Sequence, residues 1–199
     1  MRKGIQPATM PMMTLASTAI DLVAVDPAPV HATCLSFLPT DSALFFTDEE
    51  DRLLLQLQEE HYSPSIQWME SVIGSPLTRG RGLRGKIPHS PATHARIKGI
   101  VERLEPFALT CLQAATMESK SLILALTLVA RARSLQQIIA ASRVEEEFQI
   151  GIWGVVEGGH DMDRLNNAVT LSSVDTFLRL LWTPEQHAAF LLGQIMSPK

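Results

Sequence analysis

Residues 134–161, SLQQIIAASRVEEEFQIGIWGVVEGGHD, carry the strongest helix signals in this chain of 199 residues. The stretch begins with Ser134 and Gln137, a capping-box pair that satisfies free amide donors at a helix start. It ends at Gly158 and Gly159, which permit the backbone conformations that stop a helix. Apolar residues recur between these signals at steps of three or four, which predicts one long helix with a core-facing side. That side comprises Leu135, Ile138, Ala141, Val144, Phe148, Ile152 and Val155.

The opposite side of this predicted helix is unusual because it combines carboxylates with large apolar side chains. At about 100° per residue, Glu146, Ile150, Trp153 and Glu157 fall almost opposite Phe148. One interpretation is a central helix that is buried on both sides, with acids that cap neighbouring helices or pair with Arg and Lys. The other interpretation is a partner-binding face. Composition favours the first of the two.

Composition predicts a single helical domain. Hydrophobic residues make up 46% of the chain and charged residues 19%, which excludes general disorder. Leu and Ala outnumber the β-branched residues, and neither hairpin dipeptides nor sustained alternation occurs. We therefore expect an all-α fold of about eight helices over residues 11–199, after a flexible tail at 1–10.

The predicted centre of this fold is the helix at residues 119–132, which is apolar nearly all round. Its apolar run, 122–130, is half as long as a membrane span requires, and Arg131 and Arg133 follow at once. We therefore expect a surrounded core helix and no membrane insertion.

Further start and stop signals divide the rest of the chain. Thr47 with Glu50 predicts one helix start, and Pro64 is expected to break or kink the helix that follows. Thr183 with Gln186 predicts the start of a short final helix that ends near residue 193.

Residues 75–90 form an irregular, basic, Gly-rich segment. Gly80, Gly82 and Gly85 match G-x-G-x-x-G, but Ile87 replaces the hydroxyl residue of a phosphate-binding loop and Pro88 prevents an immediate helix. We expect a mobile surface loop that can contact an acidic partner.

Charge and cysteine content exclude other classes of protein. The net charge of −4 gives no electrostatic footprint for nucleic acid. Cys34 and Cys111 lie far apart without a C-x-x-C motif, so we expect reduced thiols and neither a zinc site nor a disulfide.

The best candidate for catalysis is the Glu-x-x-His formed by Glu157 and His160. Di-iron sites in helical bundles use this spacing, but they need two such pairs on different helices, and Gly158 and Gly159 would spoil the helical geometry here. We therefore expect no catalytic residues, no metal and no cofactor. A helical carboxylate-type metalloenzyme and a generic helical adaptor protein remain alternatives.

Several short runs follow one another in an order that resembles the Atp12 family, the assembly chaperones of mitochondrial F1 ATP synthase. The main run is residues 144–150 with Trp153, Gly154, Val156, Glu157, His160 and Asp161. The others are 19–21, Thr40 and Asp41 before Leu44 and Phe45, 58–61 with Pro64 and Trp68, and 120–122. Together they span the chain from about residue 10 to about residue 181.

The resemblance implies a chaperone that binds the unassembled alpha subunit of F1, prevents its aggregation and promotes assembly of the alpha/beta hexamer. It implies neither nucleotide nor metal, and a location in the mitochondrial matrix, although no targeting sequence is evident here. We expect a monomer. The family also carries a β-rich module before its helical domain, so we expect that this chain is truncated or that its lineage lacks the module.

The resemblance and the two-faced helix together predict a client-binding surface. We expect Trp153 to be its anchor and the carboxylates to pair with basic client residues, whereas Glu145 lies nearer the apolar edge. Replacing Glu146 or Glu147 by Lys should then abolish binding and leave melting intact. The predicted surface comprises Glu146, Glu147, Gln149, Trp153, Glu157, His160 and Asp161.

Overall fold

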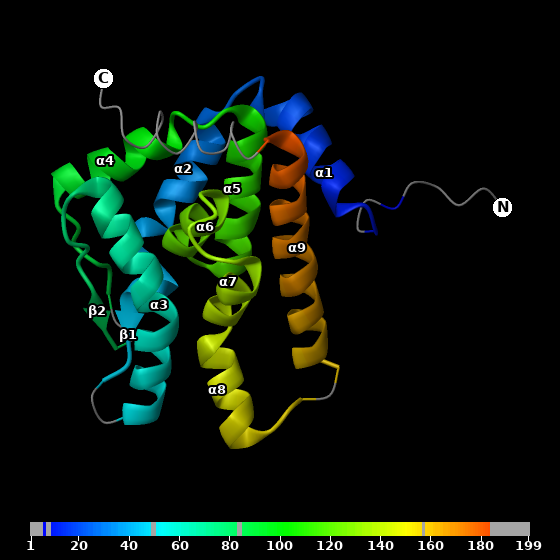
Figure 1. Cartoon of the computed structure of the whole chain (residues 1–199). Coiled ribbons are helices and arrows are strands. Elements are labelled where there is room, and N and C mark those ends of the chain that lie inside the picture. Colours follow the sequence, from blue (N-terminus) through cyan, green and yellow to red (C-terminus); the bar gives the residue numbers. More distant parts are fainter. Residues whose placement is uncertain (1–5, 7–8, 49–50, 83–84, 157, 184–199) are drawn as a thin grey trace.

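A short, wholly buried helix, α6 (Leu122–Val129), lies at the centre of the molecule (Figure 1). All eight of its residues are buried, and α3, α5, α7 and α9 pack around it. The computed structural model describes residues 6, 9–48, 51–82, 85–156 and 158–183. The prediction of an all-α fold around this apolar helix is confirmed.

Eight further α-helices surround α6 in the described residues: α1 (Pro11–Thr18), α2 (Ala28–Ser36), α3 (Arg52–Ile73), α4 (Pro91–Val101), α5 (Pro106–Ser119), α7 (Leu135–Ser142), α8 (Val144–Trp153) and α9 (His160–Leu181). A π-helix, η2 (Ala19–Val23), extends α1, and the 3-10 turns η3 (Leu38–Thr40) and η4 (Ser42–Leu44) follow α2. The two-residue strands β1 (Phe45–Phe46) and β2 (Gly80–Arg81) pair in parallel.

The start of α6 is held by two side chains that accept hydrogen bonds from its first amides. Ser121 Oγ accepts from the Leu124 amide at 3.0 Å. The buried carboxylate of Asp41 accepts from the Ile123 amide at 3.0 Å and from the Ala43 amide at 3.1 Å. Free amides at a helix start are costly when buried, so this cap fixes α6 to the turn before β1.

The long helix α3 begins later than predicted and continues past Pro64. Asp51, not Thr47, is the N-cap, since its side chain accepts from the Leu54 amide. Pro64 lies inside the helix, where it removes an amide donor. Arg133 donates to the carbonyl of His61, one turn before Pro64, at 2.6 Å.

The prediction of a single helix over residues 134–158 is wrong. The capping box at Ser134 is present, but the backbone leaves helical geometry at Arg143, with φ −121° and ψ 8°, and separates α7 from α8. Helix α8 then ends at Gly154, whose φ of 85° favours glycine. The predicted core side consequently splits: Ile138, Ala141 and Val144 are buried, whereas Ile152 and Val155 are exposed.

Some predicted features lie outside the described residues. These are most of the tail at 1–10, Glu50, and the final helix predicted after Thr183. No single helix among the described residues is long and apolar enough to cross a membrane. Within the described ranges, one helix pair, Pro11–Val23 with Ala28–Leu44, passes by length and composition together, but it is bent by 117°.

Candidate functional site: the α8–α9 surface and the groove beside α3

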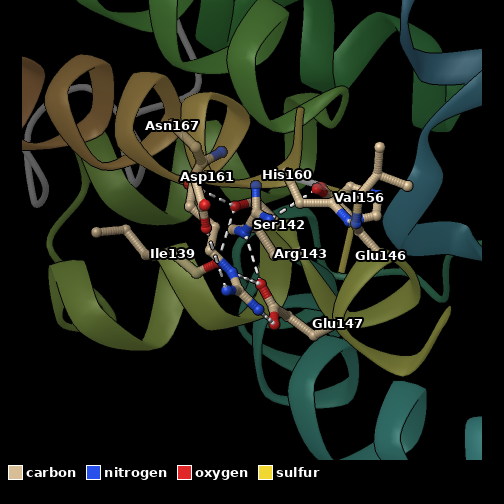
Figure 2. Close-up of polar contacts among 10 residues, drawn as sticks. Ile139, Ser142, Arg143, Glu146, Glu147, Val156, His160, Asp161 and Asn167 are labelled. Atoms are coloured by element: carbon tan, nitrogen blue, oxygen red, sulfur yellow. Dashed lines mark hydrogen bonds and ion pairs between the residues drawn. The ribbon is translucent and has the colours of Figure 1, made fainter. Parts of the chain in front are cut away.

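Arg143 sits at the joint between α7 and α8 and organises the carboxylates of the predicted surface (Figure 2). Its side chain is only 7% exposed. One guanidinium nitrogen lies 2.8 Å from Glu146 Oε1, and its Nε donates to Glu147 Oε1 at 3.0 Å. Two carboxylates therefore compensate a cation that is almost removed from water.

Glu147 also ties α8 to α9. Arg164 donates to it through Nε at 2.8 Å and through a second nitrogen at 2.5 Å, which is bidentate geometry. The hydrogen bonds from Arg164, followed by those from Arg143, hold the pKa of Glu147 below its ordinary value. The structure thus gives Glu146 and Glu147 partners within the chain.

The remaining predicted surface residues differ in how far they are available to a partner. Gln149 is exposed, and Trp153 is 76% exposed. His160 is half-buried and accepts the Val156 amide through Nδ1 at 3.0 Å. Asp161 is exposed, 4.0 Å from a guanidinium nitrogen of Arg164. Glu157 lies outside the described residues.

Four large apolar side chains are exposed at and just after the end of α8, two on each side of Gly154. We call this the apolar tip. Exposed apolar residues are normal when scattered, but a contiguous group marks an interaction site. The tip comprises Ile152, Trp153, Val155 and Val156.

A groove of about 450 Å³ lies between the first half of α3 and the α7–α8 pair. Figure 1 shows these elements at the same end of the molecule as the apolar tip. Seven of its nine lining residues are apolar or glycine, and the other two are His61 and Glu147. The lining residues are Leu53, Leu57, His61, Ala140, Val144, Glu147, Phe148, Gly151 and Ile152.

Sequence reasoning missed three residues that build this site. Gln58, buried in α3, donates to Glu145 at 2.8 Å and accepts the Thr47 amide at 2.7 Å, so Glu145 joins α8 to α3. Arg143 precedes Glu146 and Glu147 by three and four residues, a helix spacing that could have revealed it. Neither Arg164 nor Gln58 gives such a signal, because both contacts depend on tertiary packing.

The described residues offer little to catalysis. They contain no group of three or more His, Cys, Asp or Glu side chains that could hold a metal ion. Burial raises the pKa of both Cys34 and Cys111 to about 12, which suppresses the reactive thiolate. In the part of the chain that can be described, the fold is helical and the apolar tip is an exposed candidate binding surface.

Comparison with known proteins finds similarity to one group of chaperones. A family model described as ATP12 chaperone protein matches residues 1–70. The mitochondrial protein atp12 of Schizosaccharomyces pombe is 25% identical over 180 residues, which cover 86% of this chain and 62% of that protein. The mitochondrial protein ATP12 of Saccharomyces cerevisiae is 27% identical over 154 residues, covering 65% of this chain and 47% of that protein.

A solved structure gives the same result. The crystal structure of Atp12 from Paracoccus denitrificans matches with a TM-score of 0.82 and 27% identity, covering 92% of this chain and 77% of that one. The chain is thus similar to the Atp12 chaperones in both sequence and fold. It spans about three fifths of the fission-yeast relative and half of the budding-yeast relative. Similarity to proteins described as chaperones agrees with the expectation that the chain is not an enzyme.

Proposed function

We propose that this chain is an assembly chaperone that binds the unassembled alpha subunit of F1 ATP synthase, prevents its aggregation and promotes assembly of the alpha/beta hexamer. Similarity to the Atp12 chaperones supports this proposal. A subunit that lacks its partner exposes an apolar interface and aggregates. A protein that covers this interface reversibly lowers the concentration of the exposed species by mass action.

The single structural observation behind this proposal is the apolar tip beside the acidic residues of α8 and α9. Trp153, which is 76% exposed, has the size and exposure of an interface anchor. Gln149 and Asp161 are exposed nearby in sequence and can contribute a polar rim. We retain the whole predicted set as client-binding, with Glu146 and Glu147 acting also as supports of the fold.

Co-expression with the alpha subunit and, separately, with the beta subunit tests the proposal. Affinity capture should recover alpha selectively and raise its soluble fraction. Trp153→Ser should weaken capture of alpha roughly thirtyfold, as expected for an anchor worth about 2 kcal/mol. Leu180→Ser, at an equally exposed apolar site near the end of α9, is the matched control and should change little. Equal capture of alpha and beta would contradict the proposed selectivity.

The proposed compartment is the mitochondrial matrix. Both yeast relatives are named as mitochondrial proteins, whereas the Paracoccus relative is bacterial. Cell fractionation of the tagged protein in its own host would test this, and recovery outside mitochondria would contradict it.

A further inference from the structure

The groove between α3 and α8 has walls that match the repeat of a helix. On α3, Leu53, Leu57 and His61 line it at steps of four residues. On α8, Val144, Phe148 and Ile152 line it at the same step. Two helices that present parallel rows of side chains form the seat into which a third helix packs.

Gly151 lines this groove within α8, and the chain itself gives no steric reason for a glycine there. A Cβ built at this position meets nothing within 4 Å. Its φ is not positive, so the backbone does not require glycine either. Glycine inside a helix destabilises it relative to alanine. The missing side chain does, however, allow another backbone to approach closely.

Charge around the groove favours a basic occupant. None of the lining residues is Lys or Arg, and the one lining carboxylate, Glu147, is already paired with Arg143 and Arg164. Glu60 precedes His61 on α3, and its helical position places it on the solvent side of the Leu53–Leu57 row. It is exposed and forms no ion pair with another described residue. An incoming Lys or Arg would find this carboxylate available.

We propose that the groove between α3 and α8 binds an amphipathic helix of the client, with its apolar face against Leu57 and Phe148 and its closest backbone approach at Gly151. A basic side chain on the flank of that helix pairs with Glu60. This proposal rests on the proposed function, because the client is taken to be the unassembled alpha subunit. The groove proposal adds to the proposed function the kind of client segment that is recognised, a helix, and the place on this chain where that helix binds.

Gly151→Ala and Gly151→Leu test the close approach. Alanine should raise Tm by about 1–3 °C, because it favours the helix, and yet weaken capture of alpha. Leucine should weaken capture at least tenfold. Gly99 is a matched control: it also lies two residues before the last residue of its helix and also has nothing within 4 Å of a built Cβ. The same two changes there should leave capture unchanged.

Photo-crosslinking locates the client segment. Replacing Leu53 by the photoreactive residue p-benzoylphenylalanine should give crosslinks to one helical, Lys- or Arg-containing segment of alpha. The same replacement at Leu22, on the π-helix after α1, should give none. Glu60→Lys should weaken capture about tenfold, while Glu60→Gln should have a smaller effect.

The outcomes separate the two proposals. If the unmodified chain captures alpha and both Gly151 variants capture it equally well, the groove proposal is wrong and the chaperone proposal stands. Crosslinks from position 53 to a strand or loop of alpha would also overturn the groove proposal alone. If the unmodified chain captures no alpha, both proposals fall together.

Discussion

At the scale of the residue, Arg143 holds two carboxylates of α8, those of Glu146 and Glu147, by ion pairs. Its guanidinium is almost fully removed from water and lies between Glu146 and Glu147. Arg164 donates to the same Glu147 from α9. A buried cation that loses a partner is costly, because no water replaces it. The carboxylates therefore support the fold even if they also meet a client.

Reversing the charge of Glu147 should destabilise the protein. Glu147→Lys removes two hydrogen-bonded ion pairs and places a third cation beside Arg143 and Arg164, at a cost of about 2–4 kcal/mol. Thermal unfolding followed by circular dichroism should show a Tm lower by roughly 5–12 °C. The matched variant Gln149→Lys, exposed on the same helix, should stay within about 2 °C of the original.

This prediction departs from the expectation drawn from sequence, in which both carboxylates were free for a partner and melting stayed intact. An unchanged Tm for Glu147→Lys would show that the pairs with Arg143 and Arg164 contribute nothing to stability. A binding defect in that variant could then be attributed to the client surface alone.

At the scale of the element, the start of α6 depends on a carboxylate from a distant part of the chain. Asp41 is completely buried, and its two oxygens accept the Ile123 and Ala43 amides. Burial disfavours the charged form and raises the pKa of Asp41 to about 6, although the hydrogen bonds from Ser121 and these amides oppose the shift.

This raised pKa predicts a stability that falls as pH increases. Between about pH 4 and pH 6 the folded chain holds a proton on Asp41 that the unfolded chain has lost, so the free energy of unfolding decreases over this range. Asp41→Asn cannot titrate. We compare the free energy of unfolding of the unmodified protein with that of Asp41→Asn. The unmodified value minus the variant value should decrease by up to about 3 kcal/mol from pH 4 to pH 6 and then stay constant.

Urea unfolding of both proteins at each pH measures this difference. Other titrating groups are common to the two proteins and cancel. A difference that increases with pH would mean that the folded environment favours the ionised carboxylate, and that the cap outweighs the burial of Asp41.

At the scale of the whole molecule, sequence predicted the centre of the fold better than its exposed end. The run 122–130 is apolar on every side, which admits only a surrounded helix, and α6 is one. The joint at Arg143 was missed because helical periodicity continues across it. At the break, Arg143 has φ −121° and ψ 8°, and its side chain pairs with Glu146 and Glu147.

The exposure of the residues around the candidate site was predicted only in part, for a similar reason. Trp153 was singled out by its place opposite the core side, and it is exposed. Phe148 and Ile152 were expected in the core, but they line the groove between α3 and α8. A periodic pattern identifies an apolar face, whereas only the packing of neighbouring helices decides whether that face is covered.

The most direct test of the chaperone proposal is the aggregation of the F1 alpha subunit on dilution from denaturant, followed by light scattering at increasing concentrations of this chain. We predict that scattering of alpha falls to near baseline at about one chain per subunit. Scattering of the beta subunit should be unaffected. Undiminished aggregation of alpha at roughly tenfold excess of this chain, or equal protection of alpha and beta, would contradict the proposal.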